Sequence, residues 1–131
     1  MTDNELLQGF EAATLPAESF HHRDHVRVAF LYLCRYPALE ALQRFSSLLE
    51  KFAIANGKPH LYNETVTWAF ILLIRERIAR SGCRQTWVQF ADANADLLTW
   101  QDNILKKYYR EETLGSDLAK NTFLFPDRVG A

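Results

Sequence analysis

The residues best suited to chemistry in this sequence are histidines at the start of one apolar segment. His21, His22 and His25 are three of the four histidines, and they directly precede the mainly apolar run Val26 to Leu33. Residues three and four apart share one face of a helix, so His25 is a neighbour of both other imidazoles. His22 also continues the apolar stripe of this segment, which predicts that its ring points toward the core. Imidazoles exchange protons near neutral pH and ligate metals, so this turn is the first candidate site.

A second group of polar residues stands at the expected start of a later helix. His60 and Glu64 are four residues apart and share a helix face. Two imidazoles from one helix, with an imidazole and a carboxylate from another, supply the N and O donors that suit Zn, Fe, Ni or Mn. The predicted metal ligands are His22, His25, His60 and Glu64. The predicted ligand-binding residues are His22, His25, Tyr62, Asn63, Glu64 and Thr67.

Two other interpretations of these residues stay open. In one, the imidazoles are a structural network in which His22 or His25 donates to Glu64 or to a backbone carbonyl. In the other, they line a metal-free pocket for a small organic ligand. The H-x-x-H pattern lacks the glutamate of the metalloprotease signature H-E-x-x-H. No nucleophile stands beside a base in the sequence, so whether the protein is an enzyme is left open. The one cofactor that the pattern suggests is a divalent transition metal.

Composition narrows the class of protein. The chain has 131 residues with a net charge of −1, and 48% of them are hydrophobic, as in one ordinary globular domain. No basic stripe is present, which argues against nucleic acid as a partner. The longest apolar runs are too short to span a bilayer, so no membrane partner is expected. Cys34 and Cys83 lack C-x-x-C spacing, and the acidic N-terminus has no apolar signal core. We therefore expect a cytoplasmic protein whose partner is a small-molecule ligand or a second copy of the chain.

Apolar residues at helical spacing, and residue types that begin or end helices, recur along the chain. Ser19 is the expected cap of the histidine helix, which ends before Pro37 because a residue before proline disfavours helical geometry. Apolar residues then recur at steps of three and four until Gly57, a residue suited to the left-handed position after a helix. The segment from Val66 to Ile74 is apolar on most sides and is therefore expected at the centre of the fold.

No segment shows the period-two alternation of a half-buried strand. The predicted fold class is therefore all-α, a compact single-domain helical bundle of about six helices over residues 1–131. The second and fourth helices are expected to cross near His22, His25 and Glu64. The aromatic run Phe123 to Pro126 is expected to pack as an extended tail.

Several of these residues also form a pattern across most of the chain. The pattern comprises Phe20-x-His22-x-x-His25-Val26, Gly57-Lys58-Pro59, Tyr62-Asn63-Glu64-Thr65-x-Thr67-Trp68, Tyr108-Tyr109, Leu114 and Pro126-Asp127. It resembles a family of small all-helical bacterial proteins of uncharacterised function. The resemblance implies an all-helical fold with His22, His25, Tyr62 and Glu64 as the polar centre, and it implies no activity. The family's second motif reads Tyr-His-Glu-Thr, so Asn63 stands here in place of a stronger metal ligand, for which His60 would have to compensate.

Overall fold

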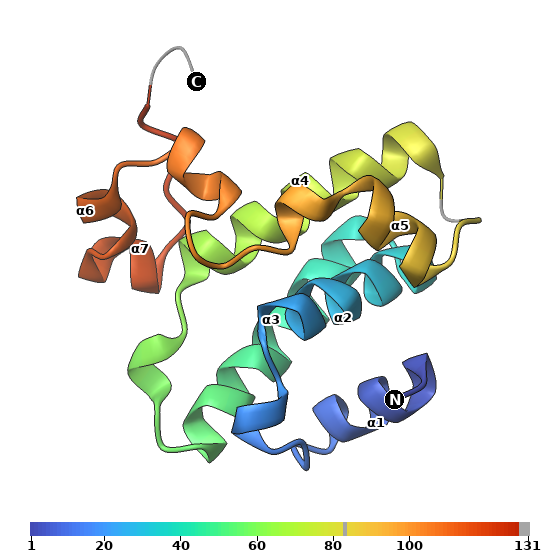
Figure 1. The fold of residues 1–131 in the computed structure, drawn as a ribbon. Helices are drawn as coiled ribbons and strands as arrows, with labels where there is room; N and C mark the ends of the chain where they lie inside the picture. Colours follow the sequence, from blue (N-terminus) through green and yellow to red (C-terminus); the bar gives the residue numbers. More distant parts are fainter. Residues whose placement is uncertain (83, 129–131) are drawn as a thin grey trace.

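The computed structural model describes residues 1–82 and 84–128, and Cys83 lies outside them. These residues form helices and connecting segments without a β-strand, which confirms the all-α prediction (Figure 1). The α-helices are α1 (Asp3–Glu11), α2 (His22–Arg35), α3 (Ala38–Ala55), α4 (Glu64–Ser81), α5 (Trp87–Ala93), α6 (Glu111–Leu114) and α7 (Asp117–Asn121). Short 3₁₀ turns connect them at η1 (Ala17–Ser19), η2 (Pro59–Leu61), η3 (Ala95–Leu97) and η4 (Ile104–Lys107). None of the described helices has the length and apolarity to cross a bilayer.

Helix α4 is central, as its apolar sequence predicts. It packs against α2 and α3, and also against η4 and α7 from the C-terminal part of the chain. Its buried residues include Phe70, Ile71, Ile74 and Ile78, which recur at helical spacing on the side that faces the core. In Figure 1, α6 and α7 lie near one end of α4, while α1, α2 and α3 lie along its other side. The start of α4 bonds these C-terminal segments, through Asn63 with the Leu114 carbonyl and Thr65 with the Thr122 carbonyl.

Two of the three helix boundaries predicted for α2 and α3 are confirmed. Helix α2 ends at Arg35, because Tyr36 adopts an extended conformation before Pro37. Gly57 has a φ of 70°, so the left-handed position after α3 is occupied by a glycine as predicted. The prediction that Ser19 caps the histidine helix is wrong.

The N-cap of α2 is His21, whose backbone N–H donates to the carboxylate of Asp24 at 3.0 Å. Ser19 belongs instead to η1. The buried side chain of Phe20 explains the difference, since drawing this ring into the core separates η1 from α2. Burial of the Phe20 ring in the core thus outweighs the preference of serine for the cap position.

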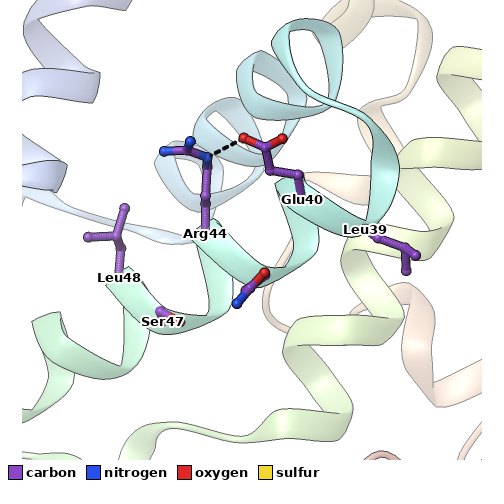
Figure 2. Close-up of a pocket in the computed structure, with 6 residues that line it drawn as sticks. Leu39, Glu40, Arg44, Ser47 and Leu48 are labelled. Atoms are coloured by element: carbon purple, nitrogen blue, oxygen red, sulfur yellow. Dashed lines mark hydrogen bonds and ion pairs between the residues drawn. The ribbon is translucent and has the colours of Figure 1, made fainter.

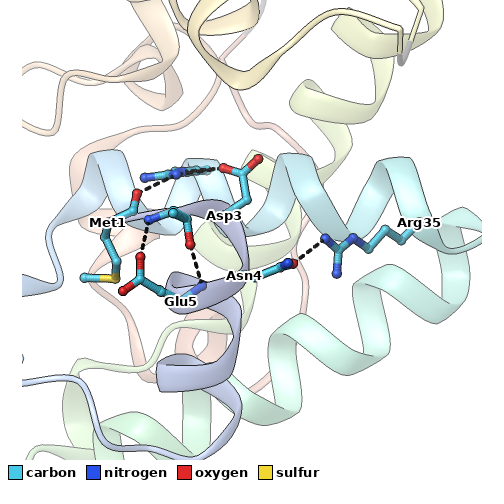
Figure 3. A network of polar contacts seen from close by, with 7 residues as sticks. Met1, Asp3, Asn4, Glu5 and Arg35 are labelled. Atoms are coloured by element: carbon cyan, nitrogen blue, oxygen red, sulfur yellow. Dashed lines mark hydrogen bonds and ion pairs between the residues drawn. The ribbon is translucent and has the colours of Figure 1, made fainter.

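Two arginines of α2 form hydrogen bonds with the start of α1 (Figure 3). Arg27 bonds the carboxylate of Asp3 at 2.7 Å and the backbone carbonyl of Met1 at 2.9 Å. Farther along α2, Arg35 donates to the side-chain oxygen of Asn4 at 3.3 Å. These contacts tie the start of α1 to α2.

Candidate functional site

One ring nitrogen of His22, at the first position of α2, bonds the protein backbone. Its Nε2 lies 2.9 Å from the backbone carbonyl of Leu97 in η3. A carbonyl only accepts, so Nε2 carries the proton and donates. The ring lies edge-on to Phe70 of α4, with centroids 4.7 Å apart, and 5.2 Å from the ring of Trp100. Burial lowers the pKa of His22, although the Leu97 carbonyl opposes this by favouring the charged form.

His25, one turn farther along α2, lies among aromatic rings. Its centroid is 4.4 Å from that of Phe20, and Phe20 in turn contacts Phe10 and Phe52. Its imidazole makes no hydrogen bond to the described residues. Burial lowers the pKa of His25 to about 4, and the nearby His22 and His21 act in the same direction. His25 is therefore a neutral imidazole at physiological pH. We call His22, His25 and their ring neighbours Phe20, Phe70 and Trp100 the imidazole cluster.

The predicted partners at the start of α4 form a separate pair. The hydroxyl of Tyr62 donates to the carboxylate of Glu64 at 2.6 Å, and both side chains are half-buried. Burial raises the pKa of Tyr62, and the Glu64 carboxylate raises it further. No hydrogen bond or ion pair in the described part of the chain joins this pair to His22 or His25. Helix α2 meets α4 through contacts such as His22 with Phe70, one to two turns beyond Glu64.

Asn63 and Thr65 attach the C-terminal part of the chain to α4. The Asn63 side chain accepts from the N–H of Val66, which caps α4, and it donates to the carbonyl of Leu114 at 2.7 Å. The hydroxyl of fully buried Thr65 donates to the carbonyl of Thr122 at 2.7 Å and accepts from the N–H of residue 124 at 3.1 Å. Thr67, a predicted ligand-binding residue, is buried within α4. Asn63 and Thr65 therefore have structural roles at the start of α4.

The four predicted metal ligands do not come together. His60 is exposed in η2, while Glu64 bonds Tyr62 and His22 bonds a backbone carbonyl. Among residues 1–82 and 84–128, no three or more His, Cys, Asp or Glu side chains form a group that could hold a metal ion. The metal site therefore stays a prediction, because the described geometry does not bring the predicted ligands together.

Two hollows of the described surface lie elsewhere. One, of about 690 Å³, lies along the outer face of α3 between Leu39 and Leu48 (Figure 2). Only this helix lines it, and its one internal polar contact is the 2.8 Å ion pair of Arg44 with Glu40. Because no second element encloses it, this hollow is an open stretch of helix surface.

The other hollow, of about 360 Å³, lies between α4 and the C-terminal part of the chain. We call it the C-terminal hollow, and it is lined by Ala69, Leu72, Leu73 and Glu76 of α4 with Leu105, Tyr108, Tyr109, Phe123, Phe125 and Pro126. Phe125 remains 84% exposed at its rim and Leu72 49% exposed. The prediction that residues 123–126 pack as a tail is therefore wrong for Phe125. None of the predicted site residues lies here, and the aromatic run from Phe123 to Pro126 is the signal in the sequence that could have indicated the hollow.

No protein-family model, curated protein or solved structure matches the chain. The resemblance to a family of small helical bacterial proteins therefore stays a prediction.

Proposed function

We propose that this protein is a non-catalytic helical binding module, which takes a small ligand in the C-terminal hollow and uses the imidazole cluster as scaffold. One observation carries the proposal: the hollow brings several elements around a volume of about 360 Å³ while leaving Phe125 84% exposed at its edge. Small-molecule sites typically have volumes of about 300 to 1,000 Å³ and mainly apolar walls. An exposed aromatic side chain beside such a hollow is a favourable contact for a ligand, because covering the ring removes apolar surface from water.

The chemistry of the imidazole cluster supports the scaffold role. The Nε2 proton of His22 is donated to Leu97, and the ring is packed against Phe70 and Trp100. His25 lies against Phe20 with its pKa far below neutrality, which suits a packed neutral ring better than a proton-transfer group at neutral pH. The Nε2 of His22 could donate to a ligand only by giving up its bond to the Leu97 carbonyl, which would leave that carbonyl unpaired.

A second candidate function is a small-ligand or metal pocket at His25, the interpretation that the sequence first suggested. The observation in its favour is that the imidazole of His25 has no hydrogen-bond partner among the described residues. Cytoplasmic location and homodimer formation also stay predictions beside either function.

The test is an amide-resolved NMR titration of the intact protein with a panel of small organic molecules and, separately, with Zn²⁺. The proposal expects ligand-induced shifts to centre on Leu72, Leu105 and Phe125. The variant His22→Ala should lower the melting temperature and still show those shifts. Shifts that centre on His22 and His25 would favour the second candidate, and a panel without shifts at the C-terminal hollow would refute the first.

A further inference from the structure

The walls of the C-terminal hollow are rich in aromatic rings that stand at an angle to one another. Phe123 and Phe125 are nearly perpendicular, with ring centroids 5.8 Å apart and an interplanar angle of 85°. Tyr108 and Tyr109 line the same space. Behind Phe123 lies Trp68, stacked on it with centroids 5.7 Å apart and planes inclined by 20°. Rings at right angles offer both faces and edges to whatever lies between them.

The backbone on both sides of Phe125 is fixed. Leu124 donates its N–H to Thr65, and its carbonyl accepts from the hydroxyl of Tyr109 at 2.7 Å. Asp127 donates its N–H to the carbonyl of Tyr108 at 3.0 Å. The anchors at Leu124 and Asp127 therefore hold the Phe125 backbone at the rim, and its ring contacts that of Phe123. A ring positioned before the ligand arrives costs less ordering entropy on binding than one that must be immobilised.

A single charged residue, Glu76, lies among the described residues that line the hollow. Its only ion pair in the described part of the chain is with Arg80 at 3.5 Å, and both side chains are more than half exposed. Exposed pairs of this kind contribute little, so the Glu76 carboxylate remains open to a competing cation. No lysine or arginine lines the hollow to repel one.

Aromatic faces and a carboxylate attract the same kind of ligand. The π faces of Phe and Tyr carry negative potential and bind ammonium groups, above all alkylated ones that shed water easily. The remaining walls, such as Leu72 and Leu105, suit an apolar arm. We infer that the C-terminal hollow binds a small organic cation, a quaternary or alkylated ammonium on a short apolar arm. This inference rests on the proposed function, because it names the ligand class of the same hollow.

The experiment compares choline with its uncharged analogue, in which a tert-butyl group replaces the trimethylammonium group. Both are titrated into the intact protein while amide resonances are followed. The expected result is that choline binds about tenfold more tightly than the analogue, with shifts at the hollow. Because the two probes have nearly the same shape, the difference reports on charge.

Matched variants assign the effect to residues. Phe125→Leu keeps the rim apolar and removes the π face, and Glu76→Gln removes the charge. Each should weaken choline binding about fivefold while leaving the analogue nearly unchanged. The controls Trp100→Leu and Glu112→Gln change an exposed aromatic residue and an exposed carboxylate outside the lining of the hollow, and should leave choline binding unchanged.

Equal or tighter binding of the uncharged analogue would overturn the cation assignment while leaving the hollow as a binding site. Choline shifts centred on Trp100 and His22 would overturn it as well, by placing the cation at the imidazole cluster. If neither probe shifts the hollow, the cation assignment falls, and the panel titration decides separately whether the hollow binds any small ligand.

Discussion

A functional site needs reactive side chains and an open space for a ligand. In this protein the imidazole cluster has the first and the C-terminal hollow has the second. The imidazole cluster holds the residues with the richest chemistry, yet His22 is bonded to Leu97 and His25 is packed on Phe20. The C-terminal hollow has ordinary residues around an open volume of about 360 Å³. The residues with reactive side chains therefore lie in the imidazole cluster, which is the better packed of the two regions.

The difference comes from what each region must satisfy. A buried imidazole needs partners or must stay neutral, and α2 meets both demands with a carbonyl from η3 and aromatic neighbours. In the C-terminal segment, Thr65 and Tyr109 instead form hydrogen bonds with the backbone of Leu124, while the Phe125 side chain remains exposed. A segment whose backbone is already ordered loses less conformational entropy when a ligand binds it.

The largest expected effect is on the pH dependence of stability, and it probes whether His25 is a packed neutral ring. Its pKa of about 4 in the folded protein lies below the ordinary 6.5. The unfolded chain therefore binds more protons between these values, and stability is present above about pH 6.5 and lost as the pH falls toward 4. We expect a loss of about 3 kcal/mol across this window in urea unfolding.

A variant separates His25 from other groups that titrate. His25→Leu should remove most of this slope, while the lowered pKa of His22 leaves a smaller slope of the same sign. The pKa values of Asp96 and Asp127 are also lowered, but their contributions are lost below about pH 4, outside the window. An unchanged slope in His25→Leu would show that His25 is accessible to protons in the folded protein.

The next effect tests the scaffold role of His22. His22→Ala leaves the Leu97 carbonyl without its donor and opens a gap beside Phe70, so we expect a loss of about 2 to 3 kcal/mol in thermal or urea unfolding. His60→Ala is the matched control, because His60 is exposed, and it should change stability by less than about 0.5 kcal/mol. Equal effects of the two variants would contradict the scaffold role.

A somewhat smaller effect is expected at the other region. Thr65→Val keeps the shape of a fully buried side chain but leaves the Thr122 carbonyl and the Leu124 N–H unpaired. We expect a loss of about 2 kcal/mol, with faster hydrogen exchange at the Leu124 amide. Thr99→Val, at an exposed position, is the control. Stability lost without faster exchange at Leu124 would mean that Thr65 supports the core rather than the hollow.

The smallest expected effect concerns metal. Protein purified without a histidine tag should carry no stoichiometric metal, and a chelator should leave its melting temperature unchanged. Asn63→His introduces the histidine of the Tyr-His-Glu-Thr motif, and it should cost about 1 kcal/mol through loss of the α4 cap and create no tight zinc site. Stoichiometric metal in elemental analysis of either protein would revive the metal hypothesis at His22, His25 and Glu64.

Sequence alone determined the features that depend on neighbouring residues. The helical class, the end of α2 before Pro37, the left-handed Gly57 and the apolar centre of α4 all follow from local spacing and backbone preference. The inward direction of His22 follows as well, because it continues an apolar stripe. These features depend on residues a few positions apart, whose geometry a helix fixes.

Only the tertiary structure decided the partners. His22 bonds a carbonyl 75 residues away, and Thr65 bonds backbone groups 57 and 59 residues away. The sequence around either residue contains no trace of these contacts, because backbone carbonyls and amides are the same for every residue. The exposure of Phe125 is likewise set by distant anchors. Local sequence thus determined which residues turn inward, and packing between distant segments decided which of them were already satisfied and where an open space remained.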